Sequence, residues 1–377
     1  MFRIARVPGK CLLDPCVIGT DARLIIEIEG CWIPAGIHRI FSSVTNGCFI
    51  AILLSLWIQV YMIQGGLWYC ESMERYRMFS HWCMETYGHK LYRIALDAGM
   101  TCPNRDGTLD SRGCIFCDAG GSGDFATKYD GQKIDMSSVS YVHHPELGSG
   151  YFIAYFQAYT NTYAPLARLR FLFSSALSDP LFAGISIATR PDCLGPDVIS
   201  LLDELKKEYP SKFIWIELGL QTMHEDTARW MRRGYPLSVF EQAVNVLQMH
   251  GFPVIVHVIL GLPGDDKQRV LETVRYLNRF HLFGVKYQLL HVLKNTDLET
   301  LYEEEKIHAL TLDAYVDLVA ACIASTDPSV ILMRLSGDGD PEELVAPLWS
   351  LAKRQVLNRI QHELKTRNIT QGCWLPL

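Results

Sequence analysis

The most informative stretch of this 377-residue sequence reads Cys102-Pro-Asn-Arg-Asp-Gly-Thr-Leu-Asp-Ser-Arg-Gly-Cys114-Ile-Phe-Cys117. A CxxC turn directs two sulfurs towards one point, and the Pro, Gly and Asp residues before it let the loop bring Cys102 close. Three thiolates suit a soft metal ion or an iron–sulfur cluster. A structural zinc site needs a fourth ligand, and the candidates His143 and His144 lie 26 residues further on without a recognisable ligand spacing. Three cysteines without a fourth ligand would leave one iron of a cubane cluster open for chemistry.

Apolar segments alternate with helical patterns from residue 90 onward. The last five of six candidate strands begin about 30 to 40 residues apart, which is the length of a βα unit. Residues 254–260 are almost continuously apolar, as expected for a strand that is buried on both faces. The candidate strands are 91–97, 151–157, 183–189, 213–218, 254–260 and 285–292. They predict an α/β fold in which residues 73–330 form a partial (β/α)6 barrel, open on one side.

Polar residues and a glycine turn lie where these strands end. In such an architecture the functional site forms at the carboxyl ends of the strands. Cys102 follows the first strand, Gln157 ends the second and Arg190 follows the third, while Glu217 and Gln221 straddle the predicted end of the fourth. Gly261 ends the fifth strand. We therefore expect these residues to form one ring around a single site.

Short motifs in a fixed order carry a family resemblance. They are Leu91-Tyr-Arg-Ile-Ala-Leu-Asp-Ala-Gly-Met-Thr-Cys102, Gly113-Cys-Ile-Phe-Cys117, Tyr155-Phe-Gln-Ala-Tyr-Thr160, Ala188-Thr-Arg-Pro-Asp-Cys193, Glu217-Leu-Gly-Leu-Gln-Thr222, Arg232-Arg-Gly-Tyr235 and Gly261-Leu-Pro-Gly264. Over roughly residues 73 to 372 the chain resembles the YhcC-like radical SAM family, a relative of the Elongator catalytic-subunit type of radical SAM enzyme. The general radical SAM signature is CxxxCxxC, and the longer first spacing found here is that of the subfamily.

The resemblance implies a [4Fe–4S] cluster on Cys102, Cys114 and Cys117, with S-adenosylmethionine chelating the open iron. An electron from the cluster would then cleave the cofactor and give a 5′-deoxyadenosyl radical, while the protein positions the cofactor and excludes water. Phe116, inside the CxxC, is expected to contact the adenine. Gln157 is expected to bond the methionyl amine.

Four further residues are assigned to the cofactor by the same resemblance and by their place at strand ends. Glu217 and Gln221 would face the ribose or the carboxylate, although Glu217 could equally pair with a nearby cation. Arg190 would either grip a carboxylate or phosphate bidentately or brace the loop by pairing with Asp192. Gly261 would form a tight turn close to the cofactor.

Composition agrees with an intracellular enzyme. The chain is long enough for one large domain with an appendage, and its formal net charge of −6 gives no overall basic field for nucleic acid. The 12 cysteines are spread irregularly, without the spacing of a small disulfide scaffold. We expect reduced thiols and a cytoplasmic location.

Residues 1–72 lie outside the family pattern. The stretch 40–70 has no charged residue, and the apolar run 49–63 is short for a membrane span, which needs ~20 residues. It also lies too deep in the chain for an ordinary signal peptide. Three interpretations are open: a membrane anchor, a buried hairpin, or an upstream extension absent from the mature protein. We favour the extension, with Met73 or Met78 as the true start and a membrane location unexpected, and place the anchor second.

Residues 331–377 are predicted to form a C-terminal helical tail that is locally basic. Its cations are Lys353, Arg354, Arg359, Lys365 and Arg367. Such charges usually mark a solvated helix face. The Elongator-like kinship suggests that they hold a tRNA backbone while a wobble uridine is presented to the radical.

Two other functions remain open at this point. A radical SAM enzyme could act on a protein or small molecule instead of tRNA. A non-catalytic module could use its three thiolates for structural metal binding, but it would need only its own ligands and not a ring of polar strand ends. An enzyme would also need an electron donor, for which a flavodoxin- or ferredoxin-like protein is expected.

Overall fold

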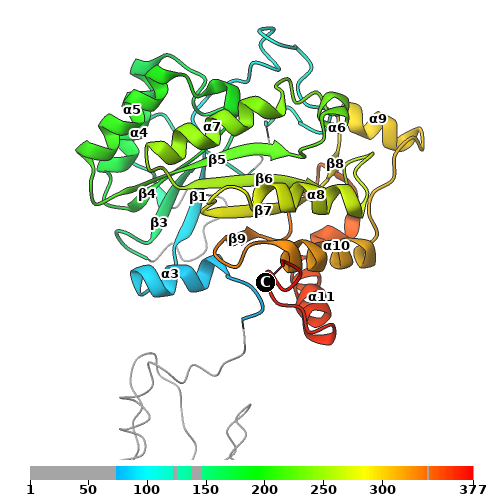
Figure 1. The fold of residues 1–377 in the computed structure, drawn as a ribbon. Coiled ribbons are helices and arrows are strands. Elements are labelled where there is room, and N and C mark those ends of the chain that lie inside the picture. The colour runs from blue at the N-terminus through cyan, green and yellow to red at the C-terminus, as the bar shows by residue number, and fades with distance from the viewer. Residues whose placement is uncertain (1–73, 122–124, 137–138, 140–146, 338, 377) are drawn as a thin grey trace, which may run out of the picture. The chain divides into compact units, whose positions relative to one another are not determined.

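The centre of the computed structural model is a parallel sheet of eight strands in the order β2-β1-β3-β4-β5-β6-β7-β9 (Figure 1). Their bounds are β1 Tyr92–Asp97, β2 Thr127–Lys128, β3 Phe152–Phe156, β4 Phe182–Thr189, β5 Phe213–Gln221, β6 Val254–Leu260, β7 Gly284–Leu289 and β9 Ile331–Arg334. All six predicted strands are present. No ladder joins β2 to β9 among the described residues, so the sheet is an open partial barrel, as predicted.

The structure describes residues 74–376 apart from 122–124, 137–138, 140–146 and 338. They all belong to one compact unit, Met73–Leu377. The predictions made for residues 1–72, including the apolar run 49–63, lie outside the described residues. Within the described part, no helix has the length and apolar character needed to cross a membrane.

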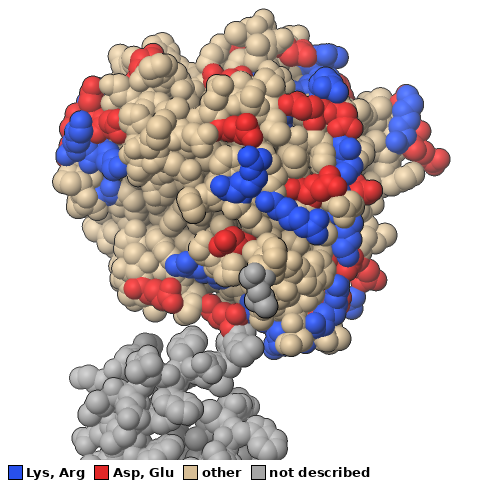
Figure 2. Space-filling view, viewed as in Figure 1, with Lys and Arg blue, Asp and Glu red and all other residues tan. Residues whose placement is uncertain are grey.

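Helices cover one face of the sheet and carry the main core (Figure 1). The helices are α3 Phe79–Tyr87, α4 Leu166–Ser178, α5 Pro196–Glu208, α6 Glu225–Trp230, α7 Leu237–Met249, α8 Lys267–Leu277, α9 Asp297–Glu303, α10 Leu312–Ser325 and α11 Lys353–Thr366. Strand residues such as Phe156 and Val256 pack against helix residues such as Phe173 and Val244, all fully buried. Each buried side chain of this size stabilises the fold by about 1.5–3 kcal/mol. Figure 2 shows acidic and basic side chains interspersed over this face of the molecule.

The opposite face of the sheet forms the barrel interior, and α3 packs against its amino-terminal end. Trp82 of α3 packs edge-on against Trp215 and Phe283, with ring centroids 5.7 and 5.0 Å apart. Met78, just before α3, bridges to Leu332 of β9. The amino-terminal end of the interior is therefore apolar and covered, which leaves the carboxyl ends of the strands as the end at which a site can form.

Residues 331–377 differ from the helical tail that the sequence predicts. Ile331–Arg334 is strand β9 of the main sheet, and β10 (Leu344–Ala346) pairs antiparallel with β8 (Val292–Leu293). Helix α11 buries Val356, Ile360 and Leu364 in the main core. A strand of four residues is too short to show a periodic pattern, which is why the sequence did not reveal it.

Candidate cofactor site

The loop that carries the three cysteines directly follows β1 and is held in shape by its own main chain. The carbonyl of Cys102 accepts hydrogen bonds from the amides of Arg105 (2.8 Å) and Asp106 (3.1 Å). The Cys117 amide donates to the Cys114 carbonyl at 3.0 Å, closing the CxxC turn. The three thiols form no disulfide and are partly exposed. They therefore remain available as ligands.

Burial and nearby cations act in opposite directions on the thiols of this loop. Burial raises the pKa of the Cys114 thiol and raises that of Cys117 to about 12. The charge of Cys102 also raises the pKa of Cys114, so these two thiols are near neighbours. A buried thiol of this kind ionises when a metal replaces its proton, and the cations Arg190 and Arg105 favour the thiolate form. The described residues contain no group of three ligands close enough for a single metal ion.

Asn104 ties the cysteine loop to the segment that follows α6. Its side-chain amide donates to the carbonyl of Arg232 at 2.7 Å and lies 3.5 Å from the Cys114 sulfur. The main chain of Ile115 donates to the Met231 carbonyl at 3.2 Å. Gly234 has φ +83°, and a Cβ there would lie 2.6 Å from the Asn104 amide oxygen. The motif Arg232–Tyr235 thus holds the cysteine loop in place through its contacts with Asn104.

Arg190 is part of the same brace. Its guanidinium makes a bidentate pair with Asp192 at 2.9 and 2.8 Å and donates to the Arg233 carbonyl at 3.0 Å. It also lies over the Tyr235 ring, 4.9 Å from the centroid. Of the two roles left open for Arg190, the structure shows the loop brace.

Replacing Gly234 with alanine should destabilise the cysteine loop. The left-handed backbone costs roughly 1–2 kcal/mol for a residue with a side chain, and the new Cβ would push against Asn104. We expect a lower denaturation midpoint together with less iron bound per chain. Gly148→Ala is the matched control, because a Cβ at Gly148 meets nothing within 4 Å. Equal iron content in the two variants would show that the brace does not matter.

Several predicted residues do meet at the carboxyl end of the sheet. Gln157 directly follows β3, and Gly261 directly follows β6 with φ +94°. Gln221 is the last residue of β5, with φ +69°, and its side-chain oxygen is buried without a hydrogen-bond partner. Phe116 packs, partly buried, against the apolar cluster that includes Met231. The orphaned oxygen of Gln221 fits a bound ligand at this edge.

The sequence predicts Glu217 at the end of a strand, but the structure does not place it there. Strand β5 continues to Gln221, so Glu217 lies in its middle, fully buried in the barrel interior. The sequence prediction ended this strand at residue 218, yet Gly219 pairs with His257 in the ladder. Because Glu217 lies four residues before the end of β5, it has neighbours that the sequence did not indicate.

These neighbours form a hydrogen-bonded network around the Glu217 carboxylate. Ser186 donates to one carboxylate oxygen at 2.7 Å, and His257 Nε2 lies 2.6 Å from the other. Lys286 donates to that same oxygen and lies 3.1 Å from the Tyr155 hydroxyl. Glu217 and Lys286 are 0% and 1% exposed, so this is a buried ion pair.

Burial and charge set the protonation of this network. Burial opposes ionisation of Glu217, but the charge of Lys286 and the hydrogen bond from His257 outweigh it and hold the pKa of Glu217 well below its usual range. Burial lowers the pKa of Lys286 to about 7 and that of His257 to about 4. His257 is therefore neutral at pH 7 and donates through Nε2, the satisfied core histidine that its place in an apolar strand suggests.

Comparison with known proteins supports the interpretation of this site. Residues 111–277 match the model of the Radical SAM superfamily, and residues 283–366 match the Radical_SAM C-terminal domain. The chain is 41% identical over 305 residues to the uncharacterized protein YtqA of Bacillus subtilis, covering 81% of this chain and 94% of that protein. The chain belongs to the radical SAM superfamily. Protein YhcC of Escherichia coli is 32% identical over 79% of this chain and 96% of its own length.

The chain is more distantly similar to Elongator proteins. Elongator complex protein 3 of Schizosaccharomyces pombe is 28% identical over 168 residues, which is 44% of this chain and 30% of that protein. A solved structure of Elp3 from Methanocaldococcus infernus superposes with a TM-score of 0.50 at 13% identity, covering 58% of this chain and 55% of that one. The structural likeness supports the open parallel barrel. The superfamily match makes this chain a radical SAM enzyme.

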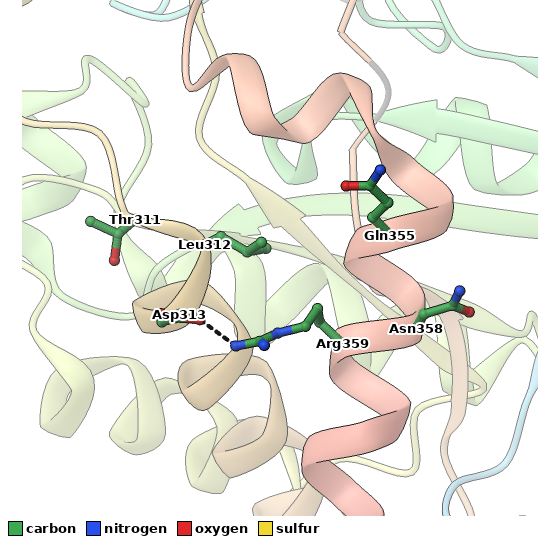
Figure 3. A pocket seen from close by; sticks show the side chains of 6 residues that line it. All are labelled: Thr311, Leu312, Asp313, Gln355, Asn358 and Arg359. Atoms are coloured by element: carbon green, nitrogen blue, oxygen red, sulfur yellow. Dashed lines mark hydrogen bonds and ion pairs between the residues drawn. The ribbon is translucent and has the colours of Figure 1, made fainter.

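A surface pocket of this radical SAM enzyme lies away from the predicted site residues (Figure 3). It measures about 570 Å³ and lies between the start of α10 and helix α11. Arg359 reaches from α11 to Asp313 at 2.5 Å, and Gln355 projects from the same helix (Figure 3). None of its lining residues was singled out as a ligand of the cofactor.

Sequence reasoning missed the charged residues of the barrel interior. Lys286 sits between Val285 and Tyr287, and Arg93 between Tyr92 and Ile94, each in a strand of the parallel sheet. A lone cation in an otherwise apolar strand was the available signal, because strand residues alternate between the two faces. The motif Arg232–Tyr235 was recognised only as part of the resemblance, and its bracing role emerged from the structure.

Proposed function

We propose that this radical SAM enzyme holds a [4Fe–4S] cluster on Cys102, Cys114 and Cys117 and uses S-adenosylmethionine to modify a wobble uridine of tRNA. The observation that carries the proposal is the arrangement of three free thiols in one braced loop at the carboxyl end of the sheet. Members of the superfamily bind this cluster and this cofactor. When bound, the two supply the reductive cleavage that yields methionine and a 5′-deoxyadenosyl radical.

The chain's own residues would position the cofactor and keep water away. Gln157 and Gln221 present amides at the ends of β3 and β5, with β4 between them, where they suit the polar groups of the cofactor. Phe116 offers a partly buried ring next to the cysteines, and Gly261, with φ +94°, forms the turn that directly follows β6. Electrons would come from a flavodoxin- or ferredoxin-like protein in the cytoplasm.

The proposal of a tRNA substrate rests on two further observations. One is the similarity to Elongator complex protein 3, which covers less than half of this chain. The other is the charge on α11. Arg354 and Lys365 are exposed, and no ion pair of either is found among the described residues, whereas Arg359 and Arg367 pair with Asp313 and Asp317. The exposed pair is suited to contact phosphates, which dominate RNA affinity.

The function is tested with reduced, cluster-loaded full-length protein. We expect slow formation of 5′-deoxyadenosine from S-adenosylmethionine alone and a several-fold increase when tRNA from cells lacking the protein is added. Mass spectrometry of nucleosides from that tRNA should then show a changed wobble uridine. If 5′-deoxyadenosine forms but tRNA neither stimulates it nor changes, the substrate is of another class. If none forms at all, the radical chemistry itself is excluded.

A further inference from the structure

The barrel interior carries more positive than negative charge. Arg93 on β1, Lys286 on β7 and Arg334 on β9 act electrostatically on the same network, and the carboxylate that acts on it from the described residues is Glu217. His257 adds no charge at neutral pH. Two of the three cations are thus left without a counter-charge although they are half-buried, and an anion that joined them would offset the cost of removing them partly from water.

Arg93 and Arg334 form no ion pair with any residue in the described part of the chain. The Nε atom of Arg93 is buried without a hydrogen-bond partner, its Nη2 lies 3.7 Å from the sulfur of Met333, and its guanidinium lies over the Phe79 ring, 4.5 Å from the centroid. The guanidinium of Arg334 makes no hydrogen bond or ion pair within the described part of the chain. Burial lowers the pKa of Arg93, and the nearby charge of Arg334 lowers it further. Both guanidinium groups therefore keep N–H donors that no acceptor among the described residues satisfies, and Arg93 reaches the residue next to Arg334 on β9.

Their place in the fold sets this pair apart from the cofactor site. Strand β9 is one edge of the sheet and β1 lies next to the other edge, so the two arginines flank the open side of the barrel. Arg93 is the second residue of β1, four residues and ~13 Å below its carboxyl end. The pair therefore lies deeper than the cysteine loop, and Arg93 and Arg334 are both partly exposed, so solvent reaches them.

We propose that Arg93 and Arg334 form a subsite for an anionic group of the substrate, either a carboxylate or a phosphate. Guanidinium groups bind such planar or tetrahedral oxyanions through paired N–H donors, and a pair of them supplies the charge that Glu217 leaves uncompensated. The subsite would hold the anionic group of the substrate inside the barrel. The reactive part of the substrate would then point towards the carboxyl ends of the strands, where the cofactor is expected. That the anion belongs to the substrate, and not to a separate ligand, rests on the proposed function.

Anion binding is tested on the cluster-loaded full chain without S-adenosylmethionine. Inorganic phosphate and acetate are titrated at constant ionic strength against chloride, and the thermal midpoint is followed. We expect at least one of the two anions to raise the thermal midpoint in a saturable way, since a ligand that binds the folded state stabilises it. A rise with acetate identifies a carboxylate subsite, and a rise with phosphate alone identifies a phosphate subsite. No saturable rise with either probe would overturn the proposal.

Two variants make the test specific. Arg334→Gln should weaken binding of the effective probe at least about tenfold, the loss of a charge-assisted bidentate contact. Arg170→Gln, which removes a partly exposed arginine of α4 that pairs with Glu204 and Glu208 of α5, should bind as the wild type does. Unchanged binding by Arg334→Gln refutes the subsite. This assay needs no turnover, so wild-type protein that binds anions but makes no 5′-deoxyadenosine would refute the proposed function alone.

Discussion

The Cys114→Ala and Cys117→Ala variants are expected to lose the iron, the sulfide and all measurable cleavage of S-adenosylmethionine. Anaerobic reconstitution of the wild type should give about four iron and four sulfide per chain if a cubane forms. Each variant would leave two thiolates for the cluster. Because loss of a residue that merely supports a metal ligand already costs about 10–100-fold in affinity or activity, loss of the ligand itself should cost more. Iron and sulfide analysis with the 5′-deoxyadenosine assay measures both effects.

Two other cysteines provide matched controls for this experiment. Cys193 lies close enough to Cys102 for its pKa to be raised by that charge, yet it is outside the loop. Cys373 is exposed near the end of the chain. Cys193→Ala and Cys373→Ala should both keep the wild-type iron content. Stoichiometric zinc without sulfide in the wild type, or full iron in Cys114→Ala, would contradict the assignment of the three ligands.

Much of the fold could be predicted because its signals are local. The apolar run Val254–Leu260 and the regular spacing of the strands reflect burial between helices and the barrel interior, and both can be seen in the sequence. Strand β9 has four residues and is recognisable only by its pairing with β7. The pairing of β9 with β7 joins segments that are far apart in the sequence, so no local pattern indicates it.

The site was predictable to the extent that it depends on strand ends. Cys102, Gln157 and Gly261 follow their strands as expected, because a parallel sheet brings carboxyl ends to one edge. The depth of Glu217 was not predictable, since it required the true end of β5. Its partner Lys286 is 69 residues away in sequence, and the two side chains come together because β5 and β7 both pair with β6.

Lys286→Met should be the most destabilising single substitution in the barrel interior. It leaves the carboxylate of Glu217 buried beside Ser186 and His257 without its closest cation. Breaking a buried pair in this way costs about 3–5 kcal/mol, because the remaining charge stays out of water. Urea denaturation of the full chain, followed by circular dichroism, should show the loss in the free energy of unfolding. Lys267→Met, which breaks an exposed pair with Asp317, should cost at most about 1 kcal/mol.

The double variant Glu217→Gln with Lys286→Met separates the ion pair from simple loss of packing. Glutamine keeps the shape and hydrogen-bonding capacity of Glu217 but carries no charge, so it no longer needs a buried cation. We expect the double variant to be more stable than Lys286→Met alone by about 2 kcal/mol or more. If the two substitutions instead add their costs, the buried charge of Glu217 is compensated by another group. The nearest candidate is Arg93, whose positive charge also lowers the pKa of Glu217.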